Sequence, residues 1–185
     1  MQVGLILAAG AGSRMGQPKA SLIVNGERLI DRAVTNFLNA GISEVFVVLG
    51  AWQGEVPNAH VIINDQWVDG MGSSLRAGLR VLLENPKYLD VVISLVDLPG
   101  MTSEAIHSVS TSASEIAMGS FSGKAGHPVK CLRKYWAEII ESASGDNGAR
   151  NFLKGRDDID LIDLNGKARG GDIDTPEDLA AFNNE

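Results

Sequence analysis

The chain has 185 residues, of which 44% are hydrophobic and 21% are charged, and its formal net charge is −7. This length suits one domain with a substantial core, so we expect a single domain over residues 1–185. The composition excludes a disordered chain, and the negative charge argues against non-specific binding to nucleic acid or to an anionic membrane. Cys131 is the only cysteine, so no internal disulfide can form and the reducing cytoplasm is the expected compartment.

Short apolar runs alternate along the chain with longer segments of helical period. Strands are predicted, in chain order, at residues 3–7, 44–50, 60–64, 90–96, 115–121 and 158–164. Helices are predicted at residues 29–41, 73–85, 103–113, 133–143, 148–154 and 175–184. Strands that are separated by helices indicate a mostly parallel sheet that is covered on both faces, so the predicted fold class is a three-layer α/β/α arrangement.

The first predicted strand runs into the glycine-rich stretch AAGAGSRMGQPK, residues 8–19. Residues 1–26 contain Arg14 and Lys19 but no Asp or Glu, although the whole chain is negative. Ligands of parallel sheets bind at the carboxyl ends of the strands, and glycine lets backbone N–H groups approach a phosphate closely. The stretch therefore favours an anionic ligand, and the alternative is a surface loop with two solvated cations.

The spacing of the glycines separates three kinds of phosphate loop. Gly10, Gly12 and Gly16 are one residue too widely spaced for the dinucleotide fingerprint G-x-G-x-x-G. The second predicted strand ends in LGAW, without the acid that holds a ribose. No lysine follows a glycine at the spacing of a P-loop, G-x-x-x-x-G-K-[ST]. What remains is a longer, open loop that suits a polyphosphate.

The stretch LAAGAGSRMGQPK resembles the L-A-A-G-x-G-x-R-M-G-x-P-K signature of the molybdenum-cofactor cytidylyltransferase and guanylyltransferase (MobA-like) family. Later stretches resemble the later blocks of that family in the same order, namely NDQWVDGMGSSLRAGL, LVDLPGMTSEAI, GHPV, GDNGAR and DIDTPEDL. The resemblance implies the nucleotide-diphospho-sugar transferase (Rossmann-like) fold. It also implies that a phosphate oxygen of an acceptor attacks the α-phosphorus of a nucleoside triphosphate and that pyrophosphate leaves.

The resemblance assigns the nucleotide to two stretches of the chain. The first supplies Leu7, Ala8, Ala9, Gly10, Gly12, Ser13, Arg14 and Lys19. Arg14 is expected to reach the leaving phosphates and Lys19 the α-phosphate, and both are expected to be catalytic together with Asp97. The second stretch places Gly72, Ser73 and Ser74 against the nucleobase. Trp67 is close enough in sequence to stack there, with packing in the core as the alternative.

Three aspartates are the candidate metal ligands. Asp97 follows a fully apolar predicted strand, so its carboxylate is expected at the ligand-binding edge of the sheet. Mg²⁺ prefers one or two carboxylates together with phosphate oxygens, and Mg²⁺ is the expected cofactor. Asp172 and Asp174 precede the last helix, and alternate residues of an extended segment point the same way. Asp174 is favoured as the second ligand over Asp172, and the alternative is that Asp174 only caps the helix.

The resemblance assigns His127 and Arg150 to the acceptor, where Arg150 would pair with a pterin phosphate. The expected function is transfer of CMP from CTP to the terminal phosphate of molybdopterin, with a molybdoenzyme receiving the product. CTP is favoured because relatives that use GTP read L-A-G-G where this chain has LAAG, so that Ala9 narrows the slot for the base. Two alternatives stay open. The first is a nucleotidyltransferase of the same fold that uses another acceptor, such as a sugar phosphate, or uses GTP as the donor. The second is a carrier of molybdenum cofactor without turnover.

Overall fold

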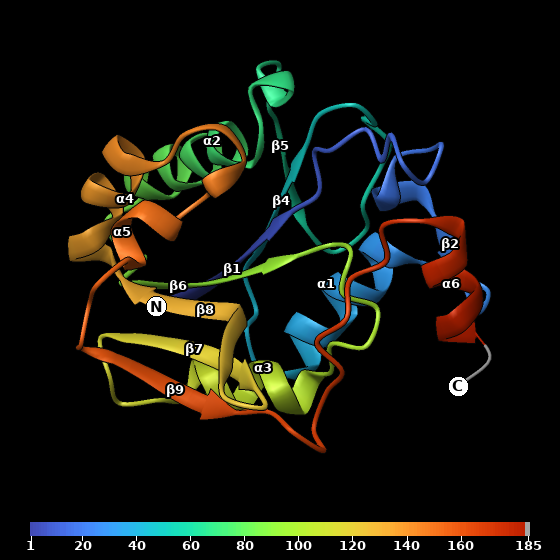
Figure 1. Ribbon diagram of the computed structural model, residues 1–185. Helices are drawn as coiled ribbons and strands as arrows, with labels where there is room; N and C mark the ends of the chain where they lie inside the picture. Colours follow the sequence, from blue (N-terminus) through green and yellow to red (C-terminus); the bar gives the residue numbers. More distant parts are fainter. Residues whose placement is uncertain (184–185) are drawn as a thin grey trace.

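The computed structural model describes residues 1–183, which form a seven-stranded sheet between two layers of helices (Figure 1). Across the sheet the strands are β5 (His60–Ile63), β4 (Val45–Leu49), β1 (Gln2–Leu7), β6 (Asp90–Leu95), β8 (Lys124–Leu132), β7 (Ile116–Phe121) and β9 (Ile159–Asp163). β8 is antiparallel to β6 and β7, and the other neighbouring pairs are parallel. A separate two-stranded sheet is formed by β2 (Ile23–Val24) and β3 (Glu27–Arg28).

The helices divide between the two faces of the sheet. They are α1 (Leu29–Asn39), α2 (Met71–Glu84), α3 (Ser103–Ser110), α4 (Trp136–Ser142), α5 (Arg150–Leu153) and α6 (Pro176–Asn183). Figure 1 shows α2, α4 and α5 together on one face and α1 and α3 on the other, with α6 beyond α1. The predicted three-layer α/β/α fold with a mostly parallel sheet is confirmed. None of the helices in residues 1–183 is long and apolar enough to cross a bilayer.

The central strand β1 is buried on both faces because its side chains alternate between two cores. Ile6 packs with the core beneath α1 and α3, whereas Leu5 and Leu7 pack with the core beneath α2 and α4. Gly4 permits the close approach of α1, since a Cβ at this position would collide with the ring of Phe37. The apolar run of β1 therefore anchors both helical layers, and it brings the glycine loop to the carboxyl edge of the sheet.

The six predicted strands are confirmed, each within one residue at either end. The predicted helices are also present, with shifted ends. α2 begins two residues earlier than predicted, at Met71, and α4 begins at Trp136 because Arg133–Tyr135 forms a 3-10 turn. The predicted last position of the final helix, residue 184, lies outside the described residues.

The sequence analysis missed β8, whose sequence is KAGHPVKCL. The pairing of β7 with β8 shifts register so that His127 and Pro128 bulge out of the ladder, where a proline needs no partner for the N–H that it lacks. Lys130 is buried, and its ammonium group donates a hydrogen bond to the Ser112 carbonyl oxygen at 2.5 Å. Because the strand contains an interior proline and a buried lysine, its sequence lacks the alternation of apolar and polar residues that predicts a strand.

Candidate active site

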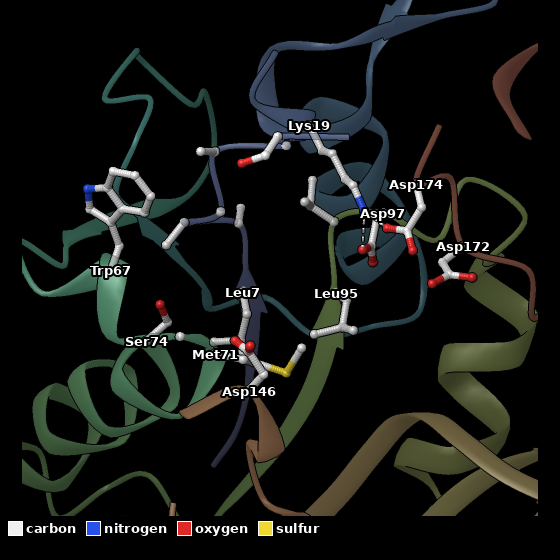
Figure 2. A pocket seen from close by; sticks show the side chains of 18 of the residues that line it. Leu7, Lys19, Trp67, Met71, Ser74, Leu95, Asp97, Asp146, Asp172 and Asp174 are labelled. Atoms are coloured by element: carbon white, nitrogen blue, oxygen red, sulfur yellow. Dashed lines mark hydrogen bonds and ion pairs between the residues drawn. The ribbon is translucent and has the colours of Figure 1, made fainter. Parts of the chain in front are cut away.

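A cleft of about 600 Å³ lies at the carboxyl ends of β1 and β6 (Figure 2). It is lined by the glycine loop after β1, the segment that leads into α2, the end of β6, and acidic residues from two later loops. The predicted site residues that line it are Leu7, Ala8, Ala9, Gly10, Gly12, Ser13, Arg14, Lys19, Ser74, Asp97, Asp172 and Asp174. Residues from four distant parts of the sequence thus meet at one edge of the sheet, as the fold class predicts.

The glycine loop has a fixed shape in which the glycines serve different purposes. Gly12 has a φ of +63° and a Cβ there would collide with the Gln17 carbonyl oxygen, so only glycine fits without strain. The Gly16 N–H donates to the Gly12 carbonyl oxygen at 2.9 Å and closes the turn. A Cβ at Gly10 would meet nothing within 4 Å. Gly12 therefore shapes the loop, whereas Gly10 leaves its backbone open to the cleft.

Lys19 joins two of the aspartates at one end of the cleft. Its ammonium group donates to Asp97 Oδ2 at 2.8 Å and also to Asp174 Oδ1. The guanidinium group of Arg14 lies 2.6 Å from Asp174 Oδ2, although the Arg14 side chain is 71% exposed. Figure 2 shows Lys19 pointing down to Asp97 and Asp174 from the wall of the cleft. Both predicted cations thus lie beside the predicted acids.

These ion pairs stabilise the charged forms of their members. Burial lowers the pKa of Lys19, but hydrogen bonds and charge from Asp174 and Asp97 outweigh burial, so the pKa lies above its ordinary value. The hydrogen bond from Lys19 lowers the pKa of Asp174, and the charges of Lys19 and Arg14 lower it further. The Lys19 ammonium group and the Asp174 carboxylate are therefore both charged at neutral pH.

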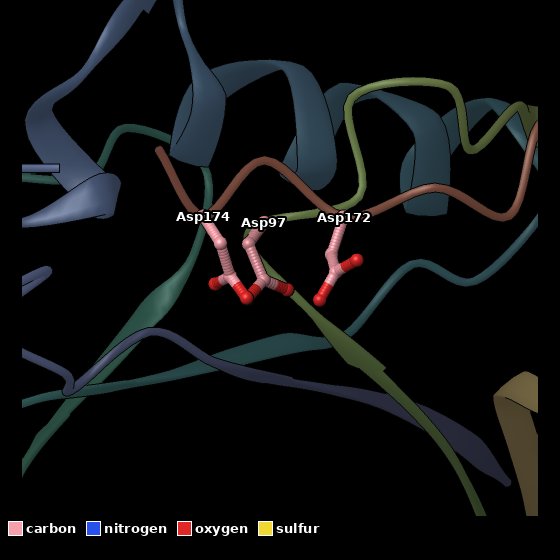
Figure 3. A group of neighbouring side chains, drawn as sticks. All are labelled: Asp97, Asp172 and Asp174. Atoms are coloured by element: carbon pink, nitrogen blue, oxygen red, sulfur yellow. The ribbon is translucent and has the colours of Figure 1, made fainter. Parts of the chain in front are cut away.

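Asp97, Asp172 and Asp174 form an acidic cluster at the same end, with one oxygen atom of each within 4.8 Å of the others (Figure 3). A backbone hydrogen bond assembles the cluster, because the N–H of the buried Ile173 donates to the Asp97 carbonyl oxygen at 2.9 Å. Asp178 then holds the turn into α6, since its Oδ2 accepts from the N–H groups of Asp174 and Thr175. The side chains of Asp172 and Asp174 flank Ile173 and point with Asp97 to one side (Figure 3).

Asp97 has an oxygen that the described chain leaves without a partner. Its Oδ1 is buried and accepts no hydrogen bond from residues 1–183, whereas its Oδ2 accepts from Lys19. A buried carboxylate oxygen without a donor is costly unless something else meets it. Three carboxylates in oxygen-only surroundings fit Mg²⁺ or a similar hard divalent cation, so the orphaned oxygen is consistent with a metal site.

The opposite end of the cleft is lined mainly by apolar side chains, of which Val68 and Met71 were not assigned from the sequence. Trp67, Val68 and Met71 line it together with Ala9, and Figure 2 places Trp67 and the acidic cluster at opposite ends. Trp67 packs so closely on Gly50 that a Cβ there would collide with the indole. The apolar wall depends on the contact between the loop before α2 and Gly50, directly after β4.

Gly72 and Ser73 do not line the cleft, although they lie beside Ser74 in sequence. A Cβ at Gly72 would collide with the Ser144 backbone, so glycine lets the loop around residues 144–148 pack on α2. That loop brings Asp146 into the cleft, a residue that the sequence analysis did not assign. The Ser73 hydroxyl is engaged inside the protein with the carbonyl oxygens of Gln66 and Gly70, at 2.8 Å each.

His127 and Arg150 are not among the residues that line the cleft. His127 lies on β8, and its Nδ1 is 3.3 Å from the Ile93 carbonyl oxygen. Burial lowers the pKa of His127, against smaller opposing effects of Ile93 and Asp97. Arg150 is exposed at the start of α5. Their assignment to the acceptor stays a prediction.

A model of the family described as the MobA-like NTP transferase domain matches residues 4–160. The chain belongs to this family. The match covers the glycine loop and Asp97, and Asp172 and Asp174 follow beyond it. The predicted resemblance to the MobA-like family is confirmed.

Relatives of this MobA-like chain have different names. A nicotine blue oxidoreductase from Paenarthrobacter nicotinovorans is 33% identical, over 95% of this chain and 93% of its own. A molybdenum cofactor guanylyltransferase from Sinorhizobium fredii (strain NBRC 101917 / NGR234) is 27% identical, over 69% of this chain and 61% of its own.

The structure of Rv0371c from Mycobacterium tuberculosis H37Rv has a TM-score of 0.83 to this chain, with 21% identity and coverage of 100% of this chain and 98% of its own. A complex of Rv0371c with manganese has a TM-score of 0.75, with 20% identity and coverage of 100% and 98%. At this identity the likeness shows the fold, and it confirms the predicted nucleotidyltransferase architecture.

Proposed function

We propose that this MobA-like protein transfers CMP from CTP to the terminal phosphate of molybdopterin, releases pyrophosphate and acts in the cytoplasm. The observation that carries the proposal is the division of one cleft into two ends. Arg14, Lys19 and three carboxylates occupy one end, and an apolar wall beside Trp67 occupies the other. This division matches a nucleoside triphosphate, whose phosphates are charged and whose base is flat and largely apolar.

We propose Mg²⁺ as the cofactor, held by Asp97 and Asp174 with Asp172 beside them. A divalent cation, when bound there, neutralises negative charge on the phosphates and orients them. The orphaned Oδ1 of Asp97 and the all-carboxylate cluster support this assignment. The complex of the structurally similar Rv0371c with manganese supports a divalent cation in this fold.

The side chains contribute to the transfer mainly by positioning the reactants and neutralising charge, with little covalent chemistry of their own. A phosphate oxygen of the acceptor forms a bond to the α-phosphorus of the nucleotide, and the bond from that phosphorus to the bridging oxygen breaks. Lys19 is the group for the α-phosphate because its side chain is only 14% exposed and its ammonium group lies 2.8 Å from Asp97 Oδ2. Arg14 is the group for the leaving pyrophosphate, because its side chain is exposed and its guanidinium group lies at the same end of the cleft, beside Asp174. Both cations stabilise charge that moves away from the α-phosphorus.

The apolar end of the cleft is the proposed site of the base. The methyl group of Ala9 projects at the end of β1, where it narrows the slot and favours a pyrimidine over a purine. Ser74 faces this slot, and Gly72 and Ser73 support it by holding the surrounding loops. His127 and Arg150 remain the proposed acceptor residues, outside the nucleotide cleft itself.

A redox reaction is the alternative that the oxidoreductase name of one relative raises. The chain offers no acid directly after β4, where Gly50, Ala51 and Trp52 follow Leu49, so the ribose of a nicotinamide dinucleotide lacks its usual carboxylate partner. The cluster of carboxylates with two cations also has no role in hydride transfer. We therefore favour nucleotidyl transfer.

Pyrophosphate release tests the proposal directly. The purified protein is mixed with Mg²⁺, one of CTP, GTP, ATP or UTP, and molybdopterin or a sugar phosphate. We expect release with CTP and molybdopterin, and much less with the other pairs. Release of pyrophosphate with GTP in place of CTP would change the donor in the proposal. Release with a sugar phosphate in place of molybdopterin would change the acceptor. Tight binding of molybdopterin without release would indicate a carrier, and oxidation of NADH or NADPH would indicate a reductase.

A further inference from the structure

The buried side chain of Asn64 lies behind the base end of the cleft, directly after β5. Its Oδ1 accepts from the Gln66 N–H at 3.0 Å, and its Nδ2 donates to Ser73 Oγ at 2.9 Å and to Ser74 Oγ at 3.0 Å. Asn64, Ser73 and Ser74 are each no more than 5% exposed. All the polar atoms of the Asn64 side chain therefore have protein partners.

The direction of these hydrogen bonds follows from the partners. A backbone N–H only donates, so the atom that faces Gln66 N must be the Asn64 oxygen, and the amide nitrogen must face the serines. Ser73 then accepts from Asn64 and donates its own proton to a backbone carbonyl oxygen, of Gln66 or Gly70. Every group of Ser73 is used inside the protein.

Ser74 differs from Ser73 in one respect. Its Oγ accepts from Asn64, but within residues 1–183 its hydroxyl proton has no acceptor, and Ser74 lines the cleft. Figure 2 shows the Ser74 side chain on the same side of the cleft as Trp67 and away from the acidic cluster. A buried hydroxyl whose lone pair is occupied has a proton to donate, and the cleft is where a ligand can accept it.

We propose that Asn64 is a positioning residue that fixes the Ser74 hydroxyl as a hydrogen-bond donor to the nucleobase. This inference rests on the proposed function, because it takes the apolar end of the cleft as the site of the base. The cytosine base, which is attached to the ribose through N1, carries two neighbouring acceptors, O2 and N3, on its Watson–Crick edge. Ser74 selects for an acceptor at this point. Asn64 already donates to Ser74 Oγ, so the hydroxyl proton cannot be donated back to residue 64 and stays available to the base.

The substitution Asn64→Asp reverses this arrangement while it keeps the size of the side chain. Asp still offers an oxygen to the Gln66 N–H, but its second oxygen accepts where the amide nitrogen donated. The Ser74 hydroxyl then donates to residue 64 and presents only lone pairs to the cleft. A base acceptor at this position meets an oxygen without a proton, and the contact becomes repulsive.

The test compares binding of CTP with binding of inorganic tripolyphosphate, both with Mg²⁺, by calorimetry. Tripolyphosphate lacks a base, so the ratio of the two affinities isolates recognition of the base from any added charge. We expect Asn64→Asp and Ser74→Ala each to lower this ratio about ten- to hundredfold, and the double variant to lower it no further. Ser110→Ala is the matched control, because Ser110 is a buried helical serine that donates to the His107 carbonyl oxygen and does not line the cleft, and it should leave the ratio unchanged.

A ratio within twofold of wild type in folded Asn64→Asp or Ser74→Ala would overturn the inference, as would fully additive losses in the double variant. If Asn64→Asp does not fold, Asn64→Ala replaces it in the same cycle with Ser74→Ala. If the wild type prefers GTP to CTP, the proposal that CTP is the donor fails. The same comparison of single and double variants is then run with GTP, and it still decides the role of Asn64. Failure of the wild type to bind any nucleoside triphosphate more tightly than tripolyphosphate would overturn both.

Discussion

Lys19 occupies the place in the acidic cluster where a metal ion would neutralise the same carboxylates. Its ammonium group touches both Asp97 and Asp174, and the three side chains are only 14–22% exposed. A divalent cation that binds without nucleotide must therefore compete with Lys19. The substitution Lys19→Met removes the competitor and keeps a chain of similar length, so we expect tighter binding of the metal and slower catalysis.

The expected size of the effect on metal binding follows from the charges. Two unit charges about 4 Å apart attract by about 1 kcal/mol in water and by about 4 kcal/mol at an effective dielectric constant of about 20. Even with the lower value, the two carboxylates together attract the ammonium group by about 2 kcal/mol. This exceeds the roughly 1.4 kcal/mol that corresponds to a factor of ten in affinity. We therefore expect Lys19→Met to bind Mn²⁺ alone at least about tenfold more tightly than the wild type.

The assay titrates Mn²⁺ into nucleotide-free protein and follows free Mn²⁺ by electron paramagnetic resonance. Lys124→Met is the matched control, since Lys124 is exposed and does not line the cleft. Pyrophosphate release by Lys19→Met should fall about a hundredfold in kcat, because an ammonium group near the α-phosphate is lost. The reasoning is refuted if Lys19→Met binds Mn²⁺ no more tightly than Lys124→Met does.

Three further substitutions test separate parts of the site. Asp97→Asn should lower turnover at least about a hundredfold with little change in melting temperature, because it removes a charge at the edge of the sheet rather than a core contact; near-normal turnover would remove Asp97 from the mechanism. Ala9→Gly should raise kcat/KM for GTP relative to CTP about tenfold, since one methyl group in a pocket is worth about 1–3 kcal/mol; an unchanged ratio would show that Ala9 does not select the base. His127→Gln should stabilise the protein relative to wild type as the pH falls below the ordinary histidine pKa of 6.5, because the unfolded wild type takes up a proton that the folded protein refuses. Chemical denaturation at pH 7 and pH 5 measures this difference, and equal losses in the two proteins would contradict it.

The parts of the fold that the sequence predicts are those in which local pattern and tertiary burial agree. β1, β4 and β6 are central parallel strands, and their continuous apolar runs are what burial on both faces requires. β8 is buried only over residues 128–131, and its bulge at Pro128 and its buried Lys130 depend on contacts with β7 and Ser112. No local pattern encodes those contacts, so the antiparallel strand escaped prediction.

The site divides in the same way. Arg14, Lys19 and Asp97 follow directly from strands that end at one edge of the sheet, so topology alone predicts that they meet. Asp146 and Trp67 enter the cleft through loops whose positions depend on close packing at Gly72 and Gly50. Asn64 begins the stretch NDQWVDGMGSSLRAGL, but its role depends on which of its two polar side-chain atoms faces the serines. A sequence does not reveal that orientation.

The backbone hydrogen bond from Ile173 to Asp97 makes the acidic cluster suitable for substitution of its side chains. The bond uses the carbonyl oxygen of Asp97 and the N–H of Ile173, and Asp178 fixes the next turn through the N–H groups of Asp174 and Thr175. None of these three contacts involves the carboxylate of a candidate metal ligand. Replacing Asp97 or Asp174 by Asn therefore removes charge without releasing the segment that carries the cluster. A loss of turnover in either variant then reports on charge at the phosphates, because the backbone hydrogen bond that aligns the end of β6 with the loop before α6 remains in place.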